Sequence, residues 1–184
     1  MVFIPPNWFE GLLVYGLIFV LPIIIGILLF FIGGVGFESV LAGFLGILII
    51  FGGLGISGYV WYEMYEVPSV NEEVITVQEW QPKVGLGTNG DGMMVIDSAD
   101  DLMLVTTNGT CFYNDEHFWF QKFNTRDVFN QLKVNGTYRI KYYGWREPYN
   151  NGFPNILTVE EVINEDNVST PQYSDYFGVK LANG

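Results

Sequence analysis

The chain has 184 residues, of which 20 are acidic and 8 are basic, so its formal net charge at pH 7 is −12. A surface of this charge repels phosphate, which excludes nucleic acid as an expected partner. The single cysteine, Cys111, excludes an intramolecular disulfide, and we expect it to be a small buried apolar residue. The charges are unevenly placed, because no lysine or arginine precedes Lys83.

Two long uncharged segments dominate the first third of the chain. Residues 11–34 and 39–62 each exceed the roughly 20 residues that a helix needs to cross about 30 Å of hydrocarbon. Only a short turn separates them, so we predict a transmembrane helical hairpin with both of its ends on the same side of the bilayer. Residues 1–10 lack the basic charge of a signal peptide and are expected to form an interfacial segment.

Small residues recur in the second predicted span at spacings that let two helix backbones approach closely. In the first span, Pro22 lacks the amide that would bond the carbonyl four residues earlier, so we expect a kink there. Trp8, Phe9 and residues 61–65 form an aromatic belt at the end of the hairpin that holds both of its ends. We predict helix contacts, within the hairpin or with neighbouring subunits, at Ala42, Gly43, Gly46, Gly53 and Ser57.

The remainder of the chain alternates short strands with turns. A linker at residues 63–73 leads into a β-domain at residues 74–163, and residues 164–184 form a tail. We predict strands in residues 74–84, 93–97, 101–107, 137–145 and 153–163, an aromatic segment at 111–123 and one short helix in 124–132. This is the order of an all-β OB-like small barrel with one short helix, and a small barrel or sandwich of another topology is the alternative. Alternation in residues 137–145 places Tyr138 and Ile140 inside and Arg139 and Lys141 on the outer wall.

Two segments near the end of this domain resemble a known architecture. A two-helix anchor followed by a β-domain containing "YYGWR" (142–146) and "FPNIL" (153–157) resembles uncharacterised two-pass membrane proteins with an OB-like exterior domain. The resemblance implies the fold and the exterior placement, and it implies no activity. The membrane-bound NfeD-like proteins share the order of helices and OB domain, but the chain lacks their glycine-rich barrel pattern.

The sequence offers few groups for catalysis or metal binding. Cys111 and His117 are the residue types of a nucleophile–base pair, although two unrelated packed side chains are the expected arrangement. A group of aspartates fits either solvated turns, which we expect, or a Ca²⁺ site that lacks EF-hand spacing. These residues are Asp91, Asp97, Asp100 and Asp101. We expect no cofactor.

Three N-glycosylation sequons begin at Asn108, Asn135 and Asn167, and they favour an exterior domain. We therefore expect a non-enzymatic structural or interaction subunit of a larger membrane assembly, in a cell envelope or a virion membrane. Its partners would be the lipid bilayer, other membrane, envelope or capsid proteins, and other copies of the chain. An exterior glycan- or ligand-binding module is the alternative, and an envelope enzyme is the third hypothesis. Partner contacts are predicted at Trp80, Tyr143, Trp145, Arg146 and Tyr149.

Overall fold

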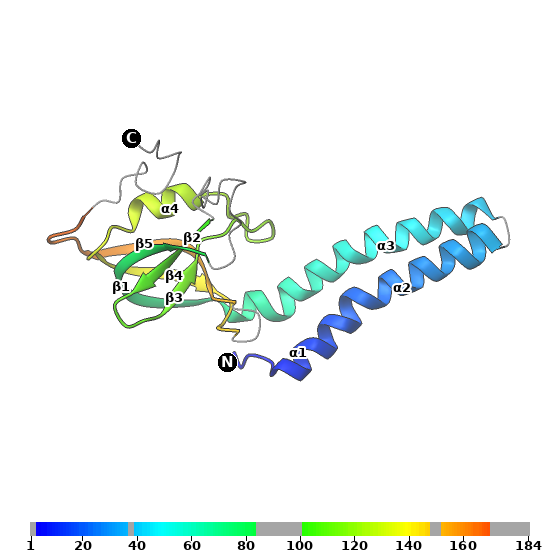
Figure 1. Cartoon of the computed structure of the whole chain (residues 1–184), viewed down its shortest axis with the longest axis horizontal. Coiled ribbons are helices and arrows are strands. Elements are labelled where there is room, and N and C mark those ends of the chain that lie inside the picture. Colours follow the sequence, from blue (N-terminus) through cyan, green and yellow to red (C-terminus); the bar gives the residue numbers. More distant parts are fainter. Residues whose placement is uncertain (1–2, 37–38, 84–100, 148–151, 170–184) are drawn as a thin grey trace, which may run out of the picture. The chain divides into compact units, whose positions relative to one another are not determined.

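The computed structural model describes residues 3–36, 39–83, 101–147 and 152–169. The chain divides into two compact units, Met1–Ser69 and Val70–Gly184, and each is described by itself below. Figure 1 shows the helices of the first unit in blue to cyan and the strands of the second in green to orange.

The first unit is a hairpin of two helical rods. The first rod begins at Trp8, after an Asn7–Glu10 capping box, and alternates α-helical with π-helical segments. The second rod begins after Ser39, whose hydroxyl accepts a hydrogen bond from the amide of Ala42. The segments are α1 (Trp8–Tyr15), η1 (Gly16–Val20), α2 (Leu21–Leu28) and η2 (Leu29–Gly36), then α3 (Val40–Trp61), η3 (Tyr62–Glu66) and η4 (Val67–Ser69).

Both rods are long and apolar enough to cross a membrane, over Trp8–Gly33 and Val40–Ser69. Their apolar side chains point outward rather than into a core, since Leu17, Phe44 and Phe51 are 64%, 62% and 73% exposed. Such a surface is suited to lipid and would be unfavourable in water. The helices also extend beyond their predicted bounds, because residues 63–69, predicted as linker, continue the second rod.

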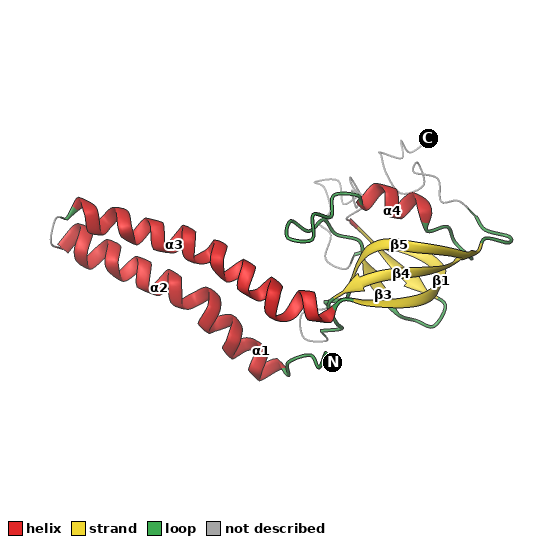
Figure 2. Ribbon diagram, turned by 180° about the vertical axis from the view of Figure 1, so that it is seen from behind, coloured by secondary structure: helices red, strands yellow, loops and turns green. Residues whose placement is uncertain are grey.

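In its described residues, the second unit is built from five strands and one helix (Figure 2). Hydrogen bonds join the strands in the order β1-β2-β3-β5-β4, and β4 also pairs with β1, so the pairings close into a ring. All neighbours are antiparallel except β3 and β5, which are parallel and meet at one residue pair, Tyr113 and Asn155. The elements are β1 (Asn71–Pro82), β2 (Leu102–Thr106), β3 (Cys111–Tyr113), α4 (Thr125–Gln131), β4 (Thr137–Tyr143) and β5 (Asn155–Asn164).

Most predicted strands of this unit are present, with shifted bounds. β1 begins three residues before the predicted start at position 74. In the aromatic segment 111–123 only Cys111–Tyr113 is a strand, because the chain turns away from the sheet at Asn114. The strand predicted at 93–97 lies outside the described residues.

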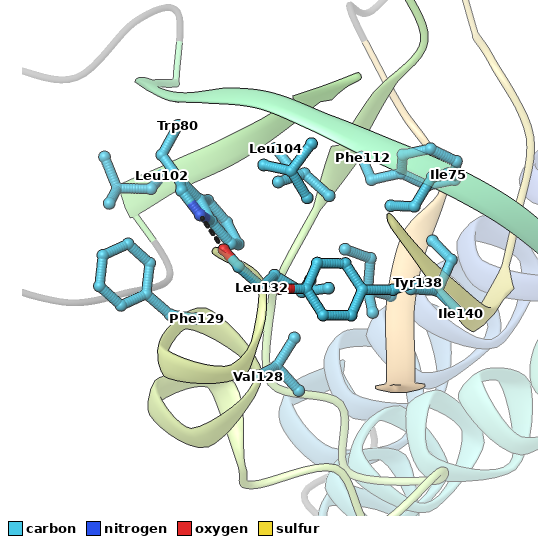
Figure 3. Packing of buried hydrophobic residues seen from close by; sticks show 12 residues of the cluster. Ile75, Trp80, Leu102, Leu104, Phe112, Val128, Phe129, Leu132, Tyr138 and Ile140 are labelled. Atoms are coloured by element: carbon cyan, nitrogen blue, oxygen red, sulfur yellow. Dashed lines mark hydrogen bonds between the residues drawn. The ribbon is translucent and has the colours of Figure 1, made fainter. Parts of the chain in front are cut away.

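The interior of the ring is filled by apolar side chains from every strand and from α4 (Figure 3). Val128 and Phe129 supply the apolar face of α4, Leu132 directly follows the helix, and all three are at most 1% exposed. Trp80 joins this face to β1: its ring centroid lies 5.0 Å from that of Phe129, and its Nε1 donates a hydrogen bond of 3.2 Å to the Leu132 carbonyl. On β4, Tyr138 and Ile140 are fully buried and Arg139 is exposed, as the alternation predicts.

The ring of strands has two ends, which we call the entry end and the far end. At the entry end, where the chain arrives from the second rod, Asn71 of β1 pairs with Tyr142 of β4, β3 ends and β5 begins. At the far end, Thr137 at the start of β4 pairs with Asn164 at the end of β5. At about 3.3 Å per residue, the length of β4 separates the two ends by roughly 20 Å.

Candidate interaction surface at the entry end

The connection between β3 and α4 forms an aromatic loop at the entry end, defined here as residues 117–123. The backbones of His117 and Lys122 exchange two hydrogen bonds of 3.0 Å, which closes a tight turn. Gln121 completes the turn with a φ of 53°. The side chains of Phe118, within this turn, and Phe123, directly after it, are 72% and 61% exposed.

The inner side of the aromatic loop stacks on the end of β4. The ring centroids of His117 and Phe120 lie 5.1 Å and 4.6 Å from that of Tyr143. The same two rings lie 5.2 Å from each other, and the Nδ1 atom of His117 accepts a hydrogen bond of 3.3 Å from the Phe120 amide. Two residues of the loop therefore fix its base, while Phe118 and Phe123 face outward.

A buried lysine, Lys122, holds the same loop through hydrogen bonds of its side chain. Lys122 is 4% exposed, and its Nζ donates hydrogen bonds of 2.9 Å to the side-chain oxygen of Asn114 and 2.6 Å to the carbonyl of Asp115. Asn114 is fully buried and in turn donates to the carbonyl of Thr125, at the start of α4, at 2.7 Å. A buried ammonium is costly unless it is hydrogen-bonded, so these bonds hold the loop in one conformation.

Beside the aromatic loop runs a row of alternating cations and rings, which we call the cation–aromatic row. Lys83 Nζ lies 4.8 Å from the ring centroid of Tyr113 and pairs with the Asp115 carboxylate. The Tyr113 ring meets Phe153 edge-to-face at 5.4 Å, and the guanidinium carbon of Arg146 lies 4.0 Å from the Phe153 centroid. Burial, reinforced by the Asp115 charge, raises the pKa of Tyr113.

The predicted partner-contact residues fall into three groups. Arg146 is exposed in the cation–aromatic row, and Tyr143 and Trp145 are half-buried at the same end. Tyr149 lies outside the described residues. Trp80 was predicted wrongly, because it is 3% exposed and belongs to the core.

A β-bulge explains the error at Trp80. Strict alternation from Ile75 and Val77 would direct position 79 inward and position 80 outward. The register of β1 against β2 shifts between Val77 and Glu79, and this extra residue reverses the alternation. Trp80 therefore turns into the core, and nothing in the local sequence marks the bulge.

The remaining candidates for chemistry have separate contacts in the structure. The Cys111 thiol is half-buried, rather than buried as expected, and its sulfur lies 3.9 Å from the Gly109 carbonyl. His117 instead stacks on Tyr143 at the entry end. Asp91, Asp97 and Asp100 lie outside the described residues, and the carbonyl of Asp101 accepts a hydrogen bond of 2.9 Å from the Lys83 amide. Within the described ranges, no group of three or more His, Cys, Asp or Glu side chains is placed to hold a metal ion.

The three sequon asparagines gather at the far end. Asn108 lies in the turn between β2 and β3, Asn135 in the turn before β4, and Asn167 in the turn after β5. All three side chains are exposed, and in the described part of the chain none of their carboxamide nitrogens donates a hydrogen bond. The Oδ1 atom of Asn108 accepts a hydrogen bond of 3.0 Å from the amide of Thr110, the third residue of its own sequon.

A hydrogen-bonded ion pair lies at the far end, next in sequence to the turns that hold Asn135 and Asn167. Glu165 accepts hydrogen bonds from Lys133 Nζ at 2.7 Å and from the Tyr138 hydroxyl at 2.8 Å. The Lys133 hydrogen bond is the largest of the effects that lower the pKa of Glu165, and the Tyr138 bond adds to it. Burial, together with the Glu165 carboxylate, raises the pKa of Tyr138 to about 12.

The predicted helix-packing residues lie along the contact between the two rods. A Cβ atom placed on Gly46 would lie 2.7 Å from the carbonyl oxygen of Gly26, and one placed on Gly53 would lie 2.6 Å from Pro22. Ala42 lies against Gly33, Gly43 is buried, and the Ser57 hydroxyl donates to the Ile18 carbonyl. The partners on the first rod were not predicted, since Gly26 and Gly33 are not spaced four apart.

The entry end thus combines a tethered aromatic loop, two exposed phenylalanines and a cation–aromatic row on one surface of the domain. No protein-family model matches the chain, and no curated protein and no solved structure matches it either.

Proposed function

We propose that the protein is a non-enzymatic, membrane-anchored interaction subunit that presents an OB-type barrel on the outer side of a membrane. The strand order β1-β2-β3-β5-β4, closed on β1 and with α4 between β3 and β4, supports the barrel assignment. In OB-type barrels the connections β1–β2 and β4–β5 border the usual binding face. Lys83, at the end of β1, and Arg146 and Phe153, in the β4–β5 connection, lie at these positions.

The observation that carries the proposal is the cation–aromatic row. Arginine and aromatic side chains are enriched in protein–protein contacts and dominate their energetics. The Arg146 guanidinium is held in place by the Phe153 ring and by hydrogen bonds of 3.0 Å and 2.8 Å to the carbonyls of Glu147 and Gly152. A pre-positioned guanidinium loses little side-chain freedom when a partner binds. The partner is another protein of the same membrane assembly.

Outer placement is supported from the opposite end of the domain. Asn108, Asn135 and Asn167 all present exposed carboxamides at the far end. Glycan acceptors of this kind are used in compartments topologically outside the cell. The hairpin then places both of its ends on the outer side, since its two rods return to the same end.

The test uses a membrane-impermeant amine cross-linker on intact cells or particles, with products identified by mass spectrometry. Lys133 and Lys141 are half-buried and accessible to the reagent, whereas Lys122 is 4% exposed and serves as an internal negative control. We expect links from the domain to other proteins of the assembly. Arg146→Ala and Phe153→Ala should each remove most of these links. Arg139→Ala is the matched control, because Arg139 pairs with Glu161 on the exposed wall of β4.

Two results would contradict the proposal in different ways. Labelling that requires lysis places the domain on the inner side and refutes the orientation. Labelling of intact material without any protein link refutes the interaction function and leaves the orientation standing.

A further inference from the structure

We infer that the aromatic loop enters the interfacial layer of the same bilayer that holds the helical hairpin, with Phe118 and Phe123 as its contact side chains. The inference rests on the membrane-anchored arrangement of the proposed function and assigns a second membrane contact to the β-domain. Phe118 and Phe123 are 72% and 61% exposed on a domain whose other large apolar side chains mostly fill its interior. Exposed apolar side chains that lie together mark an interaction site, and the Phe118 ring lies 5.2 Å from that of Trp119.

Chain continuity, rather than any packing between the two units, ties this loop to the membrane. The second candidate span runs to Ser69, and β1 begins at Asn71. Asn71 pairs with Tyr142, and the next residue, Tyr143, carries the rings of His117 and Phe120 at the base of the loop. The aromatic loop and the anchored start of β1 therefore belong to the same end of the domain.

The dimensions agree with an interfacial position. The uncharged part of the second span ends at Tyr62, and the seven residues from there to Ser69 rise about 10 Å at about 1.5 Å each. The headgroup region adds roughly 5–8 Å to each side of the hydrocarbon. The length of the chain thus holds the start of β1 close to the outer edge of the headgroups.

The chemistry of the two ends also favours lipid as the occupant. Phenylalanine and tryptophan suit the boundary between headgroups and acyl chains, and the loop offers Phe118, Trp119 and Phe123. The far end instead carries the three exposed sequon asparagines. Figure 1 shows the loop, in lime, on the side of the domain away from the orange turn that follows β5.

The loop is prepared for insertion by its tethers. Its base is fixed by the Tyr143 stack, and the buried Lys122 bonds to Asn114 and Asp115. A loop that is already ordered loses little conformational freedom when its tip enters a new environment. The side chains that would enter the bilayer do not contribute to these tethers, so they can be replaced without unfolding the domain.

The experiment measures the depth of single labels on the full chain in phosphatidylcholine vesicles, because anionic lipids would repel the acidic domain. In a Cys111→Ser background, Phe118→Cys and Phe123→Cys are labelled with an environment-sensitive fluorophore. Thr107→Cys, in an exposed turn at the far end, is the matched control. Phospholipids that carry a spin label near the headgroup serve as the quencher. We expect blue-shifted emission and at least threefold stronger quenching at positions 118 and 123 than at position 107.

Each alternative result has its own meaning. Equal quenching at all three positions, with the chain still resistant to carbonate extraction, overturns the inference and leaves the anchor intact. Release of the chain by carbonate overturns the anchor itself and the proposed function with it. Absence of lipid quenching combined with photo-cross-links from position 118 to another protein in native membranes would assign the loop to a protein partner and overturn the lipid contact.

Discussion

Ser57 donates its hydroxyl to the carbonyl of Ile18, which is the oxygen that the amide of residue 22 would bond in a regular α-helix. In a regular helix the amide four residues after position 18 would bond this carbonyl, and proline has none. The same proline rests against Gly53, where a Cβ atom would lie 2.6 Å from the proline ring. The second helix therefore donates a hydrogen bond to the first helix beside its proline, and Gly53 leaves room for the proline ring.

This relationship predicts a coupling between Ser57 and Pro22. Ser57→Ala should destabilise the hairpin by about 1 kcal/mol, the range measured for hydrogen bonds between helices in membranes. In a Pro22→Ala background the helix recovers its own amide, so the same serine substitution should cost much less. The measurement is a double-mutant cycle on the unfolding of the full chain in detergent.

The cycle has a definite failing outcome. If Ser57→Ala costs the same with and without Pro22, the hydroxyl does not act by replacing the missing amide. Ser39→Ala is a useful control, since Ser39 caps α3 and does not contact the first rod through its hydroxyl in the described contacts.

Gly46 and Gly52 should respond differently to the same substitution. A Cβ atom on Gly46 would lie 2.7 Å from the Gly26 carbonyl oxygen, whereas one on Gly52 would meet nothing within 4 Å. Gly46→Val should therefore separate the rods and cost about 1–3 kcal/mol of hairpin stability, as overpacking does in other interiors. Gly52→Val should change the stability little. Detergent unfolding of the two variants checks this, and similar losses in both would contradict the close approach at Gly46.

The Lys133–Glu165–Tyr138 group predicts an acid-sensitive contribution to the stability of the β-domain. The pKa of Glu165 is lower in the folded protein than its ordinary value of 4.5, chiefly because Lys133 donates a hydrogen bond to the carboxylate. Its contribution is therefore fully present above pH 4.5 and is lost as the pH falls through the folded pKa. Urea unfolding between pH 3 and 7 should show that Glu165→Gln lowers stability near neutrality and makes little difference at the acidic limit.

The matched control for this prediction is Glu161→Gln, which removes the exposed partner of Arg139. Exposed pairs contribute little, so its effect should be small at every pH. A Glu165→Gln effect that stays constant across the pH range would show that the carboxylate charge has no part in it.

The far-end asparagines predict stepwise glycosylation. In this reaction the carboxamide nitrogen loses a proton and bonds to the anomeric carbon of a lipid-phosphate-linked oligosaccharide, whose bond to the phosphate oxygen breaks. Translation of the chain with endoplasmic-reticulum microsomes should give up to three sugar-dependent mobility shifts. Asn108→Asp, Asn135→Asp and Asn167→Asp should each remove one shift, and aspartate tolerates the positive φ of 69° and 60° at positions 135 and 167.

Protease protection separates the two ways in which this prediction can fail. A protected domain without sugar contradicts the acceptor role of these residues. A domain that protease digests from outside the microsomes contradicts the outer placement.

Local pattern was sufficient for the parts of the fold that depend on length and periodicity. The two spans follow from uncharged length, and the inward positions of Tyr138 and Ile140 follow from alternation. Periodicity does not predict the bulge before Glu79. The bulge lies where β1 ends its pairing with β4 and begins its pairing with β2. Trp80 was predicted as a partner contact because it is aromatic, and the bulge turns it into the core.

The candidate surface was only partly predictable for a related reason. Arg146 stood out as a cation among aromatic residues, but its partner Phe153 comes from the other side of the β4–β5 connection. The segment 111–123 was recognised as aromatic, yet which of its rings are outside depends on the buried Lys122 and the Tyr143 stack. Contacts between segments distant in sequence decide both points, and a single sequence does not record them.

The junction between β3 and β5 has a single backbone pair, which makes it the least paired junction in the ring of strands. Tyr113 and Asn155 form that pair, and the Asn155 side chain adds two hydrogen bonds to the backbone of Asp115. In contrast, β4 is paired with β5 along its whole length. Around the ring, this junction lies opposite β1, the strand that receives any tension from the helical hairpin. Tyr113 also belongs to the cation–aromatic row. A partner bound to that row would contact both sides of this junction. Its binding would therefore also oppose the separation of β3 from β5 under tension.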